Sequence, residues 1–386
     1  MKFWDIGIDR SKFDLELEKK LLLENMDYLS SMSVEEQTLY KKWVELQEPS
    51  MIRRKSTIAG FYDWQWKPTD ITNKELTISE INELDPYVRI VENSDEMMKW
   101  THIRKMIHTM SWSANPGRNV KVYVIDRTSG KLLGQISLAS DVTSIKVRDN
   151  YIGWKKEDKF EKGKLNNTTI ASTIVCTQPL GFNFLGGKLI AAMTTTPAIR
   201  DYWKQKYDNV LIGVTTTSLY GVHSQYNGLP HFKTLGESTG QTATKPDDDV
   251  YIPWSHWLKT NHPEQFEDAI SRTGPKQNVI NCILKHIGVS AKTYHHGFKR
   301  GVYLAQMYDN GNEFLRSEIE ESDLVMKKKF VEGVDYINRW WKPKAIRRYE
   351  KLYDENRLKP EDLYYIDGIG CSWDSFKYQY LKDVGR

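Results

Sequence analysis

Hydrophobic positions in the first fifty residues recur at helical spacing. In "FDLELEKKLLLENMDYL" the leucines fall on one face of a helix, and a second amphipathic stretch, "QTLYKKWVEL", follows. Ser33 and Glu36 form a capping box before that second stretch. Pro49 and Ser50 break the pattern. The aromatic segment "IAGFYDWQWKPTDI" has no period, so we expect it to be a linker that packs against the rest of the chain.

The middle of the chain alternates between strand and helix patterns. "ISEINELDPYVRIVEN" predicts a cap and a strand, and "SDEMMKWTHIRKMIHTMSW" predicts a helix that ends near Ser113. "VKVYVIDRTSGKLLGQISLAS" predicts a β-hairpin with a Ser-Gly turn. Two more strands, "TTIASTIVCTQP" and "NVLIGVTTTSLYG", flank a helical stretch that opens on glycines, "GFNFLGGKLIAAMTTTPAIRDYWKQKY". This succession predicts an α/β (α+β) fold with a mixed central sheet.

Helical patterns return after Pro253. "QNVINCILKHIGV" is amphipathic, and "DLVMKKKFVEGVDYINRWW" and "AIRRYEKLYDENRL" are rich in helix formers, whereas residues 301–308 read as a strand. We therefore predict a helical N-terminal region with a linker (1–76), a core domain (77–258) and a mostly helical, basic C-terminal region (259–386). The length of 386 residues suits two or three domains of roughly 150 residues.

The composition excludes several classes of protein. Hydrophobic residues make up 39% and charged residues 27%, as in soluble folded proteins, and no apolar run approaches the roughly 20 residues that cross a bilayer. Charges near the N-terminus stand where a signal peptide needs an apolar stretch. The three cysteines are too far apart for a disulfide framework or a CxxC zinc site. We expect a cytoplasmic protein, in a bacterial or phage-infected cell, with no membrane partner.

Charge is distributed unevenly along the chain. The net charge is only +4, but residues 325–360 hold eleven Lys and Arg against five Asp and Glu, whereas the first fifty residues hold seven against eleven. Cations can contact phosphates, and indole rings interleaved with them can stack on exposed bases. The alternative is a solvated helix whose Trp side faces the core. The candidate nucleic-acid contacts, with DNA as the expected partner, are Lys327, Lys328, Arg339, Trp340, Trp341, Lys344, Arg347 and Arg348.

A glycine-bearing turn lies where a strand pattern passes into a helix pattern. Glycines at such a turn leave backbone N–H groups exposed, and the partial positive charge of a helix N-terminus adds to them, so a pyrophosphate can rest there. A purely structural turn is the alternative. The candidate cofactor-binding residues are Gln178, Gly181, Asn183, Gly186 and Gly187.

The order of hairpin, strand, glycine turn, helix and strand resembles the GNAT-type N-acyltransferase fold. In that fold the loop after the fourth strand carries Gln or Arg, two residues, Gly, one residue, then Gly or Ala, and it holds acetyl-coenzyme A. Gln178 and Gly181 match this pattern, and Asn183 replaces the last small residue. The resemblance implies acetyl-CoA or a related acyl thioester as cofactor. The phage Mom DNA-modification protein is similar in fold, and this analogy leaves iron open as a cofactor.

A longer series of motifs, over roughly residues 85 to 245, resembles the DruA family of Druantia anti-phage defence proteins. The family pattern has a His on a helix, Gly-Arg before the hairpin, Ile-Gly-Trp, a Tyr-containing loop and a final Leu-Gly-x-Thr-x-Gly-Arg. The matching positions here are His108, Gly117, Arg118, Ile152 to Trp154, Tyr226, Leu235, Gly236, Thr239 and Gly240. Gln241 replaces the last Arg. The resemblance implies a defence role, with proteins of a defence system or of a phage as partners.

A loop rich in hydroxyl groups and histidines follows the last predicted strand of the core. In α/β folds, loops after strands carry catalytic groups; a His can accept a proton from an amine near neutral pH, and a Tyr can return one to a leaving group. The candidate catalytic residues are His223, Tyr226, His108 and Ser218. For each His the alternative is an imidazole that serves only the fold. No ligand spacing indicates a metal site.

These observations give two hypotheses. The first is a GNAT-like transferase that acylates or otherwise modifies a nucleobase amine in DNA, in phage or bacterial defence or counter-defence. The alternative is a catalytically inactive nucleic-acid-binding component of a defence system or phage assembly. The departures at Asn183 and Gln241 favour the alternative.

Overall fold

The computed structural model describes residues 12–113, 117–219, 224–238, 242–272, 274–296, 298–359 and 366–383. The chain folds into two compact units, each assembled from separate stretches: residues 1–41, 239–299 and 372–386 form the first, and residues 42–238 and 300–371 form the second. This division differs from the three consecutive domains predicted from the sequence, whose boundaries follow residues 76 and 258. A mixed sheet flanked by helices confirms the predicted α+β class.

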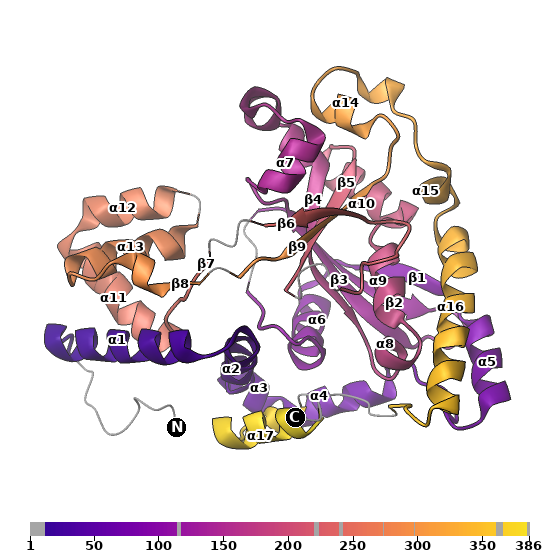
Figure 1. The fold of residues 1–386 in the computed structure, drawn as a ribbon, viewed down its shortest axis with the longest axis horizontal. Coiled ribbons are helices and arrows are strands. Elements are labelled where there is room, and N and C mark those ends of the chain that lie inside the picture. The colour runs from indigo at the N-terminus through magenta and orange to yellow at the C-terminus, as the bar shows by residue number, and fades with distance from the viewer. Residues whose placement is uncertain are drawn as a thin grey trace. The chain divides into compact units, whose positions relative to one another are not determined.

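The second unit is built on a seven-stranded sheet (Figure 1). Every pair of neighbouring strands is antiparallel except β4 and β5, which run parallel. In spatial order the strands are β1 (Pro86–Val91), β2 (Asn119–Asp126), β3 (Leu132–Ser140), β4 (Thr168–Cys176), β5 (Gly213–Ser218), β9 (Gly301–Gln306) and β6 (Lys233–Glu237).

Helices α6 (Ser94–Ile107) and α9 (Gly186–Met193) pack on opposite faces of this sheet. Neighbouring residues of a strand point to opposite faces. A Cβ on Gly134 of β3 would touch Ile190 of α9, whereas the next side chain, Gln135, donates to the carbonyl of Trp100 in α6. The two helices therefore sandwich the middle of the sheet, and the apolar side chains of β2, β3 and β4 form the centre of the core.

A further helical layer covers α9. Helix α16 (Val334–Asp354) packs against both α9 and α5 (Lys74–Glu83). Its buried stripe has helical spacing: Ile337, Trp341, Ala345, Tyr349 and Leu352. The remaining helices of this unit are α3 (Pro49–Arg53), α4 (Lys55–Ala59), α7 (Lys146–Ile152), α8 (Leu180–Asn183), α10 (Pro197–Tyr207), α14 (Gly311–Leu315) and α15 (Lys328–Glu332). The short 3₁₀ or π turns are η1 (Gly60–Asp63), η2 (Glu157–Glu161), η3 (Lys164–Asn167), η5 (Glu321–Asp323) and η6 (Ile366–Gly368).

The first unit is mainly helical. It contains α1 (Leu15–Ser31), α11 (Asp248–Asn261), α12 (Pro263–Ser271), α13 (Pro275–His286), η4 (Ala291–Tyr294), α17 (Trp373–Asp383) and the short pair β7 (Thr242–Ala243) and β8 (His295–His296). Helix α2 (Val34–Leu46) begins in this unit and ends in the other. Asp247 is the polar centre of the first unit, because its carboxylate accepts hydrogen bonds from Asn25 at 3.1 Å and from the Tyr40 hydroxyl at 3.0 Å.

Most of the predicted elements are confirmed, with four corrections. Residues 77–83, predicted as a cap and the start of a strand, belong to helix α5, which Asn73 caps. Helix α6 ends at Ile107 rather than near Ser113. Helix α11 begins before Pro253 and includes it. The helix predicted over residues 323–341 is interrupted at Gly333, which separates α15 from α16, and α16 continues through Pro343 into the next predicted helix. Within the described residues, no helix combines the length and apolar character needed to span a membrane.

Candidate functional site

The parallel strands β4 and β5 pair at one end only. Their register covers Thr168 with Gly213, Thr169 with Val214 and Ile170 with Thr215, although β4 continues for six more residues. Beyond this point each strand keeps its other neighbour, β3 or β9, so the sheet divides in two. In open α/β sheets, ligands bind outside the carboxyl ends of parallel strands where the chain connections diverge. We call this region the split and treat it as the candidate site.

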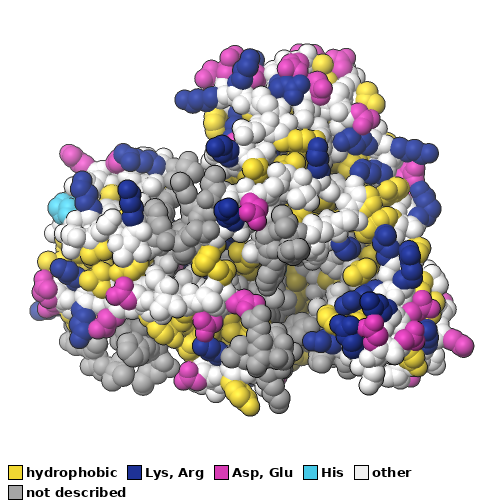
Figure 2. Space-filling model, viewed as in Figure 1, with side chains coloured by type: hydrophobic (Ala, Val, Ile, Leu, Met, Phe, Trp, Pro, Cys, Tyr) yellow, Lys and Arg dark blue, Asp and Glu magenta, His cyan; other side chains and the backbone are white. Residues whose placement is uncertain are grey.

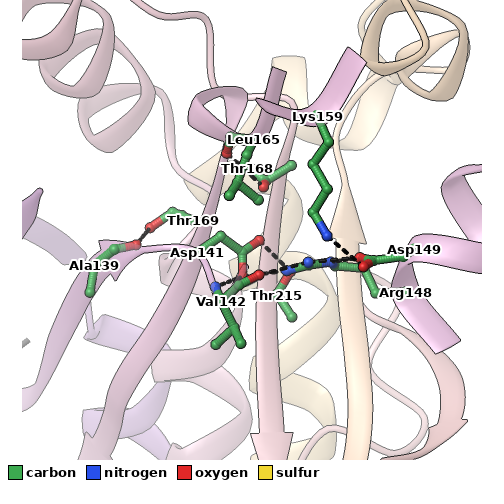
Figure 3. Close-up of polar contacts among 10 residues, drawn as sticks. All are labelled: Ala139, Asp141, Val142, Arg148, Asp149, Lys159, Leu165, Thr168, Thr169 and Thr215. Atoms are coloured by element: carbon green, nitrogen blue, oxygen red, sulfur yellow. Dashed lines mark hydrogen bonds and ion pairs between the residues drawn. The ribbon is translucent and has the colours of Figure 1, made fainter. Parts of the chain in front are cut away.

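A buried network of charges braces the paired end of the split (Figure 3). Thr215, the last paired residue of β5, donates to the Asp141 carboxylate at 3.0 Å. Arg148 of α7 lies between two carboxylates, with N–O distances of 2.6 Å to Asp141 and 2.7 Å to Asp149, and Lys159 lies 2.5 Å from Asp149. The Arg148 guanidinium is fully buried. Since each cation has a carboxylate, the network offers no charge to a ligand and fixes the strands where they begin to part.

The motif residue Trp154 covers this network. Its indole ring lies 5.2 Å from the Arg148 guanidinium, and its N–H donates to the Leu315 carbonyl at 2.7 Å. The preceding Gly153 ends α7 with φ +78°, a conformation that favours glycine. The Ile-Gly-Trp motif therefore has a structural role that the geometry explains.

Tyr226 lies at the open side of the split. The hydroxyl of Thr216 donates across the split to the Ala171 carbonyl at 3.3 Å. The Tyr226 hydroxyl lies 3.4 Å from the Thr216 hydroxyl. Gln225 donates to the Tyr226 hydroxyl at 3.2 Å, and the Tyr226 ring packs on Tyr303. Burial raises the pKa of Tyr226, so the phenol stays protonated near neutral pH and can act only as a proton donor there.

The start of α9 is joined to this Tyr226 loop. The Lys188 ammonium donates to the Gln225 carbonyl at 2.9 Å and also to the Asn227 carbonyl. A Cβ on Gly187 would come within 2.3 Å of the Gln225 side-chain oxygen, so a larger residue here would displace that side chain. The bend between β4 and α9 and the loop after β5 thus lie next to each other across the split.

The other predicted cofactor-binding residues do not leave an open cradle. The Gln178 side chain accepts from the Phe182 N–H at 3.0 Å and fills the space beside Gly181. Gly186 packs against the Cys176 sulfur and Leu180. The backbone N–H groups of residues 181–184 bond to residues 177–180 within the bend. The residues present therefore do not fit the pyrophosphate of a coenzyme A thioester at Gln178 to Asn183.

Asn183 uses its side chain inside the protein. Its amide accepts from the Lys359 N–H at 3.0 Å and donates to the Lys359 carbonyl at 2.6 Å. The residue is fully buried. The Asn that departs from the GNAT pattern thus fastens the segment after α16 to the bend, which gives the substitution a structural reason.

Four cations lie near the bend: Lys188, Lys344, Arg348 and Lys359, which we call the cationic cluster. Figure 2 shows Lys and Arg side chains gathered over the region of α8, α9 and α16. Arg348 and Lys359 lie over the Phe182 ring, 5.2 Å and 5.0 Å from its centroid. Burial and the neighbouring Lys344 lower the pKa of Lys188. Within the described residues, none of the four is ion-paired to a carboxylate.

The structure separates the other predicted nucleic-acid contacts. Lys344 and Arg348 belong to the cationic cluster, and the half-buried Trp340 lies beside it, 5.4 Å from the Lys344 ammonium. Trp341 is fully buried and donates to the Phe184 carbonyl, so its ring packs in the core and does not face solvent. Of the others, Lys327 bonds to the Gln306 carbonyl, Lys328 and Arg339 lie near Glu332, and Arg347 is exposed.

The predicted catalytic residues are also divided. Ser218 ends β5 opposite Gly301 and is buried. His108 caps the end of α6, where its Nδ1 accepts from the Met110 N–H at 2.9 Å, and burial together with Arg104 lowers its pKa well below the usual range. These contacts place His108 in a different cluster from Tyr226. His223 lies outside the described residues.

Sequence reasoning missed Lys188 and Lys359. Lys188 could have been found, because it directly follows the two glycines that open α9. Lys359 carried no such signal, since only the tertiary bond to Asn183 brings it to the bend. Across the described parts of the chain, no three His, Cys, Asp or Glu side chains gather as a metal-binding group. Asp141, which lies near the hairpin end, is engaged by Arg148.

The chain matches known proteins over most of its length. The family model of Druantia protein DruA matches residues 40–317, a longer range than the motifs at residues 85 to 245 indicated. The Druantia protein DruA of Escherichia coli (strain UMEA 4076-1) is 27% identical over 297 residues, which cover 71% of this chain and 70% of the relative. No solved structure matches the chain. The motif residues Thr239, Gly240 and Gln241 lie outside the described residues. With the family model covering both the split and the bend, the chain belongs to the DruA family.

Proposed function

We propose that the protein acts in anti-phage defence by binding nucleic acid, with the cationic cluster as the phosphate-binding surface. Membership of the DruA family supports the defence role. The observation that carries the binding proposal is the grouping of Arg348 and Lys359 over the Phe182 ring, with Lys344 and Lys188 near the same bend, and with no ion pair to a carboxylate for any of the four among the described residues. Like charges four residues apart on a helix destabilise it by about 0.2–0.5 kcal/mol, so an anion that contacts both Lys344 and Arg348 would relieve this repulsion.

The surroundings of the cluster suit a nucleic-acid strand. Phosphates would contact the ammonium and guanidinium groups, and the half-buried Trp340 offers an indole face for an exposed base. The cluster borders the bend and, through Lys188, the loop that carries Tyr226. A strand held there would pass the open side of the split.

Salt-dependent binding tests this proposal. Fluorescence anisotropy with labelled single- and double-stranded DNA, over a series of salt concentrations, gives the slope of log K against log salt. Replacing Lys344 and Arg348 together by Gln should reduce that slope by about 1.8 for duplex DNA, or about 1.4 for a single strand. The matched control is Lys204→Gln, which removes a cation already paired with Glu321. An unchanged slope in the double variant refutes the proposal.

A second candidate function is the transferase reaction on a nucleobase amine, within a GNAT-like architecture. The split between β4 and β5, with a protonated Tyr226 at its open side, supports it. Tyr226 would donate a proton to a leaving group, and a base would have to leave the duplex to reach it. Since the bend is filled by its own side chains, we route no step through a coenzyme A thioester, and the inactive binding component gains support from the same filling.

Nucleoside mass spectrometry separates these two candidates. DNA from cells that express the protein is digested and compared with DNA from cells that express Tyr226→Phe. A modified nucleoside that depends on Tyr226 supports the transferase, and unmodified DNA from cells with intact protein supports the binding component. Calorimetry with coenzyme A thioesters tests the donor separately, and we expect no binding that depends on Gly181. Defence-system proteins as partners are part of the same proposal and can be tested by co-purification from the native host.

A further inference from the structure

A cavity of about 370 Å³ lies between helix α6 and the segment that contains α4 and η1. The residues of α6 that line it form one stripe of the helix, at positions 95, 98, 99, 102 and 103. The opposite wall comes from residues between 54 and 64. Cavities that bind small molecules measure about 300–1,000 Å³, so this one has room for a small ligand. It shares no lining residue with the split or with the cationic cluster.

Two apolar side chains on these walls stay accessible to a ligand. Met98 of α6 is 40% exposed, and Trp64 on the opposite wall is half-buried. The indole of Trp64 is fixed, because its N–H donates to the Gly130 carbonyl at 3.1 Å and its ring packs edge-on against Tyr123, with the centroids 5.1 Å apart. Covering apolar surface stabilises a complex, and the flexible thioether of Met98 can adapt to the shape of a ligand. The cavity therefore favours a ligand with an apolar body.

Arg54 brings a cation to the same cavity without a carboxylate partner. It lies between two short helices, where it ends α3 and precedes α4. Its guanidinium donates to the Met98 sulfur at 3.1 Å, although a thioether is a weak acceptor. In the described parts of the chain, no carboxylate forms an ion pair with Arg54. A planar guanidinium can bind both oxygens of a carboxylate at once, so a carboxylate would use donors that the sulfur leaves weakly satisfied.

Three further side chains set the charge that suits the cavity. The Lys99 ammonium lies 4.4 Å from the centroid of the Trp64 ring, and no carboxylate of the described residues is ion-paired with it. Asp95, one turn earlier in α6, adds one negative charge to the lining. Burial and then the charge of Arg54 lower the pKa of His102, so its ring is neutral near neutral pH. Two cations against one carboxylate leave one positive charge, which suits a monoanion better than a dianion such as a phosphate ester.

We propose that this cavity binds a small organic acid, whose carboxylate accepts hydrogen bonds from Arg54 and whose apolar body packs between Met98 and Trp64. The Lys99 ammonium adds attraction for the same carboxylate. The inference does not rest on the proposed function, because the cationic cluster lies on other elements and the ligand here carries no phosphate.

Naphthalene-2-carboxylate is the probe that tests this inference, because it joins a flat apolar body to one carboxylate. Calorimetry and ligand-observed NMR on the full chain should give a Kd of about 1 mM or tighter. The neutral match, naphthalene-2-carboxamide, has the same shape without the charge and should bind about tenfold more weakly. Adenosine monophosphate, whose phosphate is dianionic, should not displace the probe.

Variants of Arg54 test the contact with the carboxylate. Arg54→Gln should weaken binding of naphthalene-2-carboxylate about tenfold or more, and Arg54→Lys, which keeps the charge but not the planar guanidinium, should weaken it less. The matched control is Arg53→Gln, which removes the same charge from an exposed neighbour that does not line the cavity. All three variants should unfold at the temperature of the wild type, since neither arginine forms an ion pair within the described residues.

The methyl resonance of Met98 shows whether the probe occupies this cavity. In protein labelled with ¹³C at the methionine methyl groups, the probe should shift the Met98 resonance, assigned from Met98→Leu. It should leave the resonance of Met193, which is fully buried in α9, unchanged.

Four results would each overturn the inference: the wild-type chain does not bind the probe or binds it without a shift at Met98, the carboxamide binds as tightly as the carboxylate, Arg54→Gln binds the probe as the wild type does, or adenosine monophosphate displaces it. None of these measurements uses DNA, and salt-dependent DNA binding can survive each of them. Failure here and failure of the proposed function are therefore distinguishable.

Discussion

Two groups of basic side chains in the second unit differ in whether carboxylates pair with them. Around Arg148 every cation has a carboxylate within 2.7 Å, and the guanidinium is fully buried between Asp141 and Asp149. At the bend, Arg348 and Lys359 lie over the Phe182 ring, and Lys188 lies close enough to Lys344 for their charges to repel. The first group satisfies itself and holds β5 to the end of β3. The cationic cluster leaves its charge for a partner. We therefore propose a binding role for the cationic cluster and a structural role for the network around Arg148.

Removing the cation from the paired network should have the largest effect on stability. Arg148→Met leaves the buried Asp141 carboxylate without its cation, whereas Asp149 keeps Lys159, and breaking a buried ion pair in this way costs about 3–5 kcal/mol. Chemical denaturation of the wild type and the variant measures the difference. Lys204→Met, which breaks the exposed pair with Glu321, is the control and should cost less than about 1 kcal/mol. Equal losses in the two variants would contradict the distinction.

His231 tests the same distinction with a group that changes its charge. Its ring is buried against Phe330 and Tyr336, and burial and then Lys329 lower its pKa to about 3. The unfolded chain, with the ordinary His pKa of 6.5, binds a proton that the folded chain does not. Stability is therefore full above pH 6.5 and falls on acidification, by up to about 1.4 kcal/mol per pH unit down to about pH 3.

The variant His231→Phe isolates this contribution. It keeps an aromatic ring of similar size, so we expect stability near neutral pH to change little. Below pH 6.5 the decline in stability should become shallower, because unfolding of the variant takes up about one proton fewer. Urea unfolding at a series of pH values measures the slope. An identical decline in both proteins would show that other groups dominate acid unfolding.

The sequence predicted local elements better than the relations among them. The hairpin β2–β3 and strands β4 and β5 follow from alternating hydrophobic positions and turn residues, which are local signals. Helix α5 was missed because its weak amphipathic pattern adjoins a strand pattern. The cofactor prediction rested on glycines whose neighbours are set by tertiary contact: Gln178 fills the space at Gly181, and Lys359 reaches Asn183 from far along the chain. No period or spacing carries that information.

Variants of the cationic cluster should change DNA binding more than stability, whereas Arg148→Met should mainly reduce stability. Lys359→Gln removes a cation from the face of Phe182, and because like charges surround it, stability should stay within about 0.5 kcal/mol of the wild type. DNA affinity at low salt should fall, with the slope of log K against log salt reduced by about 0.9 for duplex DNA. Lys351→Gln, in α16 and near Glu355, is the matched control and should leave DNA binding unchanged. A clear loss of stability in Lys359→Gln would mean that the cationic cluster has a structural role instead.

Tyr226→Phe is expected to have a much smaller effect on stability than Arg148→Met, and it tests whether the Tyr226 hydroxyl holds the strands at the split in position. The variant loses the hydroxyl that accepts from Gln225 and keeps the ring that packs on Tyr303, so thermal unfolding should reveal a loss of about 1 kcal/mol. Tyr303→Phe, in the same ring contact, is the control, since its hydroxyl donates to Asn227 outside the split. A loss well above about 3 kcal/mol would mean that the Tyr226 hydroxyl holds β4 and β5 in position. A loss near that of the control means that the Tyr226 hydroxyl contributes no more to stability than an ordinary buried hydrogen bond, so the strands at the split are held by other contacts.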